Sequence, residues 1–272
     1  MKLITNIAIG LLSYTSLNVS AYANPNSSLH APATPQGPSI QVLLAQDVPS
    51  ALLEVKGNYR VVEGEGASPL SSGNSGKRFV VHAINGGLRW GEEYPGVKQI
   101  SVLSQNQDTC VYVNGIQYKG AITVLRGTNN RVTLVNAVPI EEFMKSTLAI
   151  RFSEKGSNEA MAAMVIAART EAYNLVQRSL GSSLPWNTTA EKAHYYGYGV
   201  TGQNNQVDAL VDETRFMVLS SSTDTTLTKL PLSLAKAEKL AEAGCDAKKI
   251  LTTAFPSTQI SLTIPASSLA LK

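Results

Sequence analysis

The chain has 272 residues, of which 23 are Lys or Arg and 20 are Asp or Glu, so its formal net charge is +3. A chain of this length forms one large domain or two small ones. The small charge, without any run of basic residues, argues against a nucleic-acid-binding protein.

The first 23 residues have the pattern of a secretory signal peptide. Lys2 is followed by an apolar run over residues 3–12, and the sequence Ala21-Tyr22-Ala23 places small residues where a signal peptidase requires them. The apolar run is too short to span a bilayer. We expect cleavage after Ala23 and a mature protein that is exported to the periplasm or the extracellular space, without a transmembrane segment.

Residues 24–39 are rich in Pro, Ser and Asn and predict a flexible linker. From residue 40 to residue 137, short apolar or alternating runs predict strands separated by frequent turns. Asn114-Gly115 is a strong two-residue hairpin signal between "CVYV" and "IQYKGAITVL". The N-terminal half should therefore be rich in β-structure.

Helices follow this β-rich half. Pro139 and two glutamates are typical of a helix start, and the next helix is expected from a cap at Asn158 to about residue 177 or 180. That second helix is rich in Ala and apolar on nearly every face, so it should be buried. A helix and a strand are expected over residues 205–220, two helices over 233–256, and a final strand after them. The predicted class is α+β, with residues 40–272 as one domain.

Metal ligands are not clustered in the sequence. The histidines His30, His82 and His194 have no second ligand three or four residues away, and only Cys110 and Cys245 are present. We therefore predict neither a metal nor another cofactor. In an exported protein the two cysteines are free to form a disulfide or to stay apart.

Arg169 lies near the middle of the predicted buried helix "NEAMAAMVIAARTEAYNL". A permanent cation in such a helix either forms an ion pair with a buried carboxylate or faces a ligand. The sequence alone leaves both roles open.

The motifs around Arg169 resemble those of the stage II sporulation protein D family, which includes the amidase enhancer LytB. The string "EAMAAMVIAARTEAY" is similar to the family's "EALKAQAVAARTYAL", and "HYYGYGVTGQNNQVDALVDETRFMVL" to its "QVYGG…AVDATRGQVL". Further likenesses extend over most of residues 40–260. The resemblance implies a domain of that fold, action on peptidoglycan glycan strands stripped of their stem peptides, and a wall amidase as a second kind of partner. The family's reaction is lytic transglycosylation in cell-wall remodelling, including cell division.

The family's catalytic glutamate lies in an "EMP" motif, eighteen residues before the arginine of "AART". This position is Arg151 in the present chain, within "RFS". A guanidinium group stays protonated and does not serve as a general acid. The family's "SSGG" and "GHGVGMSQ" segments are also missing here. Enzymatic activity is therefore uncertain, and Glu154, three residues after Arg151, is the candidate for a displaced acid, its alternative being a solvated helix-end carboxylate.

Three hypotheses remain: a transglycosylase that uses Glu154, a non-catalytic glycan-binding protein or amidase enhancer, and a purely structural exported protein. The resemblance implies a catalytic supporting role for Arg169. The candidate substrate-binding residues are Arg151, Thr170, Tyr173, His194 and Tyr196. We expect Arg169 to point towards Arg151 with an anion between them. Convergence of both arginines and the 194–198 loop on one cleft would favour binding or catalysis, whereas an Arg169 sealed against a carboxylate would favour the structural role.

Overall fold

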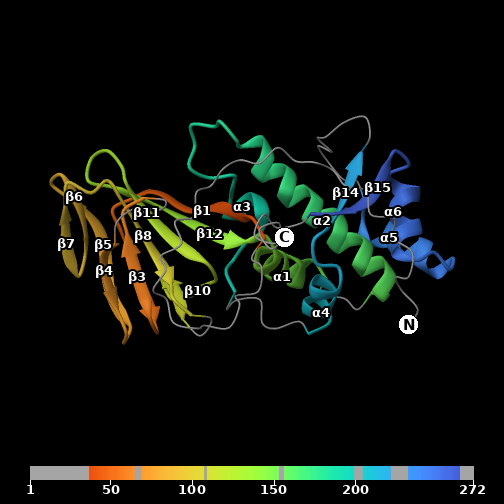
Figure 1. Cartoon of the computed structure of the whole chain (residues 1–272), viewed down its shortest axis with the longest axis horizontal. Coiled ribbons are helices and arrows are strands. Elements are labelled where there is room, and N and C mark those ends of the chain that lie inside the picture. The colour runs from red at the N-terminus through yellow and green to blue at the C-terminus, as the bar shows by residue number, and fades with distance from the viewer. Residues whose placement is uncertain are drawn as a thin grey trace, which may run out of the picture.

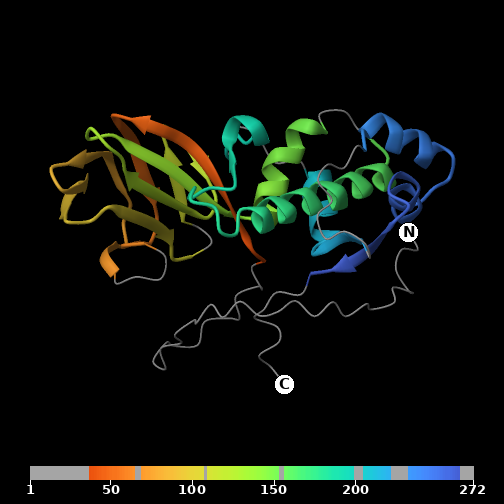
Figure 2. The ribbon, with the colours of Figure 1, turned by 90° about the horizontal axis from the view of Figure 1, so that it is seen from above.

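The computed structural model describes residues 37–64, 69–106, 109–152, 156–198, 205–221 and 232–263. The predicted signal peptide, most of the predicted linker, and Glu154 lie outside these residues. Most strands lie at one end of the molecule and most helices at the other, as Figures 1 and 2 show from two directions. The predicted α+β class, with a strand-rich first half followed by helices, is confirmed.

The strand-rich end contains two sheets. The spatial order of the seven-stranded sheet is β13 (Thr188–Thr189), β1 (Ser39–Val48), β12 (Val132–Pro139), β11 (Ala121–Arg126), β8 (Gln99–Ser104), β3 (Tyr59–Val62) and β4 (Pro69–Gly73). The order of the six-stranded sheet is β10 (Ile116–Tyr118), β9 (Cys110–Val113), β2 (Ser50–Lys56), β5 (Lys77–Ile84), β6 (Gly87–Trp90) and β7 (Glu92–Pro95). A third sheet at the helical end pairs β14 (Met217–Ser221) with β15 (Thr258–Leu262).

The two large sheets share an apolar core. Alternating residues of β2 are buried, as the sequence pattern predicts for a strand with one covered face. Trp90 of the six-stranded sheet is fully buried, and its ring contacts that of Tyr59 from the other sheet at 5.6 Å between centroids. Its indole N–H donates a hydrogen bond to the Leu53 carbonyl at 2.9 Å, so the buried polar atom is satisfied.

Six helices complete the described chain. Their bounds are α1 (Ile140–Arg151), α2 (Asn158–Arg178), α3 (Ala190–Ala193), α4 (Asn205–Glu213), α5 (Leu234–Glu242) and α6 (Ala247–Ala254). Ser233 and Asp246 cap α5 and α6 through their side chains, as predicted. The cap of α2 is Ser157, one residue before the predicted Asn158, because the Ser157 hydroxyl accepts the Ala160 N–H. The short helix α3 was not predicted.

Helix α2 is the centre of the helical end. It packs against α1, α4, α5, α6 and β14, which explains why its sequence is apolar on nearly every face. Its many alanines allow this close approach on several sides, and Ala160 and Ala163 are completely buried. The prediction of a buried Ala-rich helix is confirmed.

Strand β12 passes into α1 without an intervening loop. Pro139 is the last residue of β12 and also the N-cap of α1, with φ −54° and ψ 137°. β1 pairs antiparallel with β12, and its first residue Ser39 lies opposite Pro139. The start of α1 is therefore fixed directly to the seven-stranded sheet.

Gly120 and Gly115 allow a matched test of backbone crowding. Both have left-handed φ angles, +80° and +84°, but a Cβ at Gly120 would lie 2.1 Å from the Ala137 carbonyl oxygen, whereas that at Gly115 would have nothing within 4 Å. We expect Gly115→Ala to lower the free energy of unfolding by about 1 kcal/mol through φ strain alone. Gly120→Ala should lower it by about 3 kcal/mol because backbone must also move. Urea unfolding followed by circular dichroism measures both, and equal losses would contradict this account.

Cys110 and Cys245 form no disulfide. Cys110 lies in β9 at the strand-rich end, whereas Cys245 lies between α5 and α6 at the helical end. Figure 1 shows β10, the strand that pairs with β9, far from α5 and α6. The sequence left open whether these two cysteines pair, and their separation in the fold explains why they do not.

Candidate functional site

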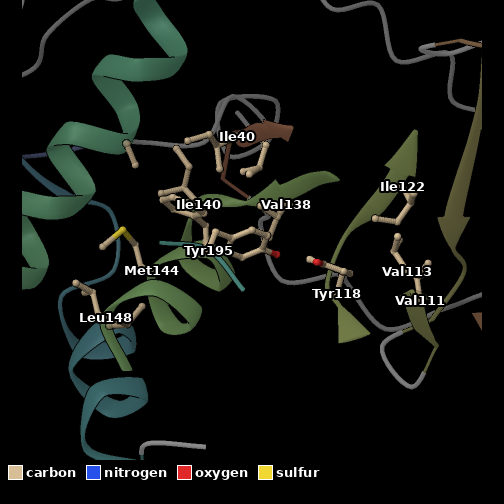
Figure 3. Packing of buried hydrophobic residues seen from close by; sticks show 14 of the residues in the cluster. Ile40, Val111, Val113, Tyr118, Ile122, Val138, Ile140, Met144, Leu148 and Tyr195 are labelled. Atoms are coloured by element: carbon tan, nitrogen blue, oxygen red, sulfur yellow. The ribbon is translucent and has the colours of Figure 1, made fainter. Parts of the chain in front are cut away.

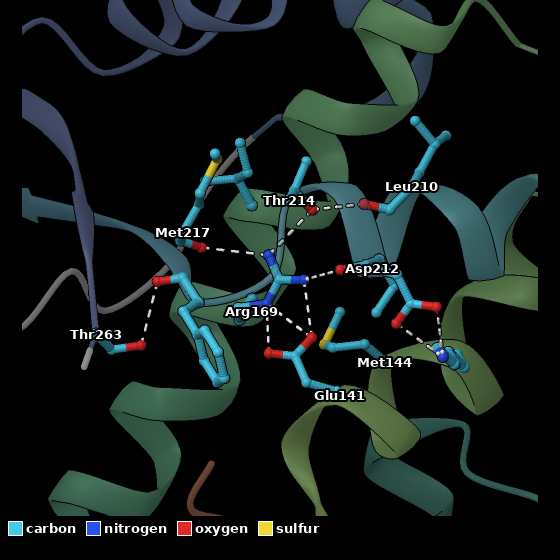
Figure 4. Close-up of polar contacts among 12 residues, drawn as sticks. Glu141, Met144, Arg169, Leu210, Asp212, Thr214, Met217 and Thr263 are labelled. Atoms are coloured by element: carbon cyan, nitrogen blue, oxygen red, sulfur yellow. Dashed lines mark hydrogen bonds and ion pairs between the residues drawn. The ribbon is translucent and has the colours of Figure 1, made fainter. Parts of the chain in front are cut away.

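Arg169 is fully buried in the helical end and pairs with Glu141 of α1. Its Nε donates to Glu141 Oε1 at 3.0 Å, and its Nη2 donates to Glu141 Oε2 at 2.9 Å, which is the bidentate geometry that favours arginine. The remaining donors reach the Val211 carbonyl at 2.9 Å, and the Met217 carbonyl and Thr214 hydroxyl, both at 3.3 Å. Figure 4 shows this guanidinium surrounded by partners from α1, α4 and the start of β14.

This environment corrects the role expected for Arg169. A side chain with 0% exposure does not touch a ligand, so Arg169 joins α1, α2, α4 and β14 from within the core. The anion beside it is Glu141, near the first turn of α1, whereas Arg151 ends that helix ten residues later, about 15 Å along the axis. The expected approach of Arg169 to Arg151 through a shared anion is therefore wrong. Arg169 instead has the second role that the sequence left open, that of an ion pair with a buried carboxylate.

Thr170 and Tyr173 are also used within the fold. Thr170 is 2% exposed, and its hydroxyl donates to the Ile166 carbonyl at 2.7 Å and accepts the Leu219 N–H at 2.9 Å. This hydroxyl links α2 to β14. Because both of its hydrogen bonds are within the buried fold, Thr170 does not make the expected contact with a substrate. The Tyr173 hydroxyl accepts a hydrogen bond from Thr263 at 3.0 Å, and burial raises the pKa of this half-buried phenol.

A groove with a volume of about 130 Å³ lies between α1, α2 and the β13–α3 segment. Side chains spaced three or four residues apart on two helices form its walls, as expected for facing helix surfaces. The lining residues are Phe143, Met144, Thr147 and Arg151 from α1; Ala168, Glu171, Ala172 and Leu175 from α2; and Thr188, Lys192 and Ala193 from β13 and α3. We regard this groove as the candidate functional site.

The charged groups of the groove come from three different helices. Arg151 and Lys192 are exposed, and Glu171 is half-buried. The floor beneath them is apolar, with Met144 and Ala172 each 1% exposed. The groove thus combines two cations, one carboxylate and a hydrophobic floor, an arrangement that suits an amphipathic ligand with negative charge.

The loop after α3 divides its residues between surface and core. His194 ends α3 in a left-handed conformation, φ 51°, directly after the groove residues Lys192 and Ala193. Tyr196 is 46% exposed, whereas Tyr195 is 1% exposed. The predicted substrate-binding residues His194 and Tyr196 are therefore on the surface, but neither lines the groove among the residues that the structure describes.

Tyr195 anchors this loop to the core that α1 and the sheets share. Its hydroxyl donates to Asn136 Oδ1 at 2.7 Å, and its ring contacts those of Phe143 and Tyr118. Asn136 in turn donates to the carbonyls of Lys119 and Ala121, both at 2.9 Å. Figure 3 shows Tyr195 in the middle of this apolar cluster, near Ile140 and Val138. The position of α3 along the groove thus depends on a buried tyrosine.

Stability should fall as the pH rises above about 10, where tyrosines ionise in the unfolded chain. Burial raises the pKa of Tyr195 in the folded protein, so the folded state keeps a proton that the unfolded state has released. The stabilisation is then complete below pH ~10 and is lost as the pH rises. Tyr195→Phe should reduce this slope and, at pH 7, lower the free energy of unfolding by about 1–3 kcal/mol because Asn136 loses a partner.

Urea unfolding between pH 7 and pH 11 measures both effects. Tyr196→Phe is the control because this side chain is exposed, and at pH 7 it should change stability by less than about 0.5 kcal/mol. An unchanged pH slope in Tyr195→Phe would contradict the assignment.

Two groove residues, Glu171 and Lys192, were missed in the sequence analysis. Glu171 follows directly on the "AART" string, where the motif quoted for the family has tyrosine, and this difference was the available signal. Lys192 belongs to the unpredicted α3 and gave no signal. Glu154 lies outside the described residues. The structure therefore places one carboxylate, Glu171, and two cations, Arg151 and Lys192, around the groove. The carboxylate is on α2, whereas the resemblance places the family's acid at Arg151 on α1.

The residues that the structure describes were also searched for metal ligands and for membrane-spanning helices. No three His, Cys, Asp or Glu side chains among them gather closely enough to hold a metal ion. None of the helices in this part of the chain is long and apolar enough to cross a membrane.

Comparison with known proteins identifies a family match over the part of the chain that contains the groove. Residues 128–220, which include α1, α2 and all but the last residue of β14, match the SpoIID family, described as stage II sporulation protein. The chain belongs to this family, which is related to sporulation and the cell wall.

Relatives extend over most of the chain. An uncharacterised protein of Chlamydia pneumoniae is 33% identical over 251 residues, 92% of this chain and 91% of that protein. An uncharacterised protein of Chlamydia muridarum is 35% identical over 214 residues, 79% of this chain and 74% of that protein. An uncharacterised protein of Brachyspira hyodysenteriae is 26% identical over 167 residues, 61% of this chain and 44% of that protein. No solved structure matches.

Proposed function

We propose that this protein acts on peptidoglycan outside the cytoplasm, where it binds glycan strands stripped of their stem peptides during cell-wall remodelling. The observation that carries the proposal is the groove between α1 and α2, because the resemblance places both the family's arginine motif and its catalytic acid on these two helices. The predicted signal peptide over residues 1–23 supports export.

Binding with little cleavage is the activity that the groove favours. The family's lytic transglycosylation requires a carboxylic acid that protonates the glycosidic oxygen and then assists attack by the sugar's own 6-hydroxyl. The corresponding position is Arg151, which lines the groove with its exposed guanidinium. A protein of this kind acts as a glycan-binding member of the family or as an enhancer of a wall amidase.

The test uses the exported protein and purified glycan strands without peptides. We expect the strands to retain the protein in a sedimentation assay, and mass spectrometry to detect few 1,6-anhydro ends after incubation. Failure to bind would contradict the proposed function, whereas abundant anhydro ends would show that the protein is an active transglycosylase.

A further inference from the structure

The charges around the groove are unequal. Arg151 and Lys192 supply two positive charges and Glu171 supplies one negative charge, so these groups carry one positive charge in excess. A ligand with one carboxylate would neutralise this excess. Arg151 is suited to that contact because its guanidinium donates two parallel hydrogen bonds to a carboxylate.

The size of the groove restricts which part of a glycan enters it. A volume of about 130 Å³ is smaller than the roughly 300–1,000 Å³ of pockets that enclose a drug-sized ligand. The groove is therefore better suited to a side group of a sugar than to a whole disaccharide. Ala172 in the apolar floor, together with Ala168 on the same helix, suits a methyl group beside the charged part of such a side group.

We propose that the groove binds the lactyl group of muramic acid, with Arg151 and Lys192 on its carboxylate and its methyl group on the alanines of α2. This inference rests on the proposed function and specifies which atoms of the strand are recognised. The lactyl group carries one carboxylate, which matches the two cations of the groove, and one methyl group, which matches its alanines.

The same contact makes Arg151 a specificity-determining residue. The lactyl carboxylate is free only after the stem peptide has been removed, because in the intact strand it forms an amide bond. An amide has no charge to pair with Arg151 and Lys192, and an attached peptide adds bulk at the mouth of a small groove.

The experiment compares peptide-free glycan strands with the same strands after their carboxylates have been converted to primary amides. We expect the wild-type protein to bind the carboxylate strands about 10-fold or more tightly, the effect of one charge-assisted hydrogen-bonded contact. Arg151→Gln and Lys192→Gln should each reduce this ratio towards one, and raised salt should reduce it in the wild type. Lys248→Gln, an exposed lysine of α6, is the control and should keep the wild-type ratio.

The outcomes separate this inference from the proposed function. If the wild type binds neither form of the strands, the proposed function fails. If it binds both equally, the proposed function stands and carboxylate recognition is overturned. If the ratio survives in Arg151→Gln and Lys192→Gln, another surface reads the carboxylate and the groove assignment is wrong. Circular dichroism confirms that each variant is folded, and Lys192→Gln decides the matter if Arg151→Gln does not fold.

Discussion

Glu141→Gln should lower the free energy of unfolding by about 3–5 kcal/mol, because it leaves the buried Arg169 guanidinium without its counter-charge. The two side chains are 7% and 0% exposed, so water does not replace the lost carboxylate. Glutamine keeps nearly the same shape, which excludes a cavity as the cause. Urea unfolding at pH 7 measures the loss.

A surface ion pair provides the matched control. Glu54 lies 3.5 Å from Arg78, whose side chain is 65% exposed, so Glu54→Gln should lower the free energy of unfolding by less than about 1 kcal/mol. The double variant Glu141→Met with Arg169→Met should lose less than the sum of the single variants, because neither charge is then left buried alone. A loss below about 1 kcal/mol in Glu141→Gln would show that the buried pair does not hold the helices together.

Arg151→Glu is expected to change activity more than any other single substitution. It restores a carboxyl group at the position where the resemblance places the family's general acid, a group worth about 10²–10⁴ in rate. The gain should be near 10²-fold, at the low end of this range, for two reasons. The family's "SSGG" and "GHGVGMSQ" segments, which the resemblance links to orienting the sugar, are missing from this chain, and a glutamate at this position no longer attracts the lactyl carboxylate. The measurement is the yield of 1,6-anhydro ends from peptide-free strands in excess.

Two further variants interpret this gain. Arg151→Gln removes the cation without adding an acid, so it should stay as inactive as the wild type. Glu154→Gln removes the alternative acid with little change in shape. If the wild type cleaves well and Glu154→Gln abolishes cleavage while binding survives, the acid has moved to Glu154 and binding without cleavage is the wrong interpretation.

Local sequence patterns predicted most of the fold. The Asn114-Gly115 hairpin, the caps Ser233 and Asp246, and the buried α2 all depend on residues close to one another in the chain, so short-range physics fixes them. The helix α3 escaped prediction because it is only four residues long and is placed by distant contacts, among them the Tyr195–Asn136 hydrogen bond.

The candidate site was harder to predict because it also depends on contacts between residues that are distant in the chain. The sequence singled out Arg151 and Arg169 but not the environment of either. Glu141, 28 residues before Arg169, gave no sign of being its partner, because a bidentate pair depends on how α1 crosses α2. Glu171 and Lys192 join Arg151 only once α1, α2 and α3 have packed, so tertiary structure assembles the groove.

The junction at Pro139 has a consequence for recognition. Because β12 becomes α1 within one residue, and β1 is paired with β12 up to that point, no flexible hinge separates the sheet from the first wall of the groove. The second wall, α2, is held against α1 by the buried Arg169. A ligand therefore meets a preorganised surface, and little of its interaction energy is lost in ordering the polypeptide that receives it.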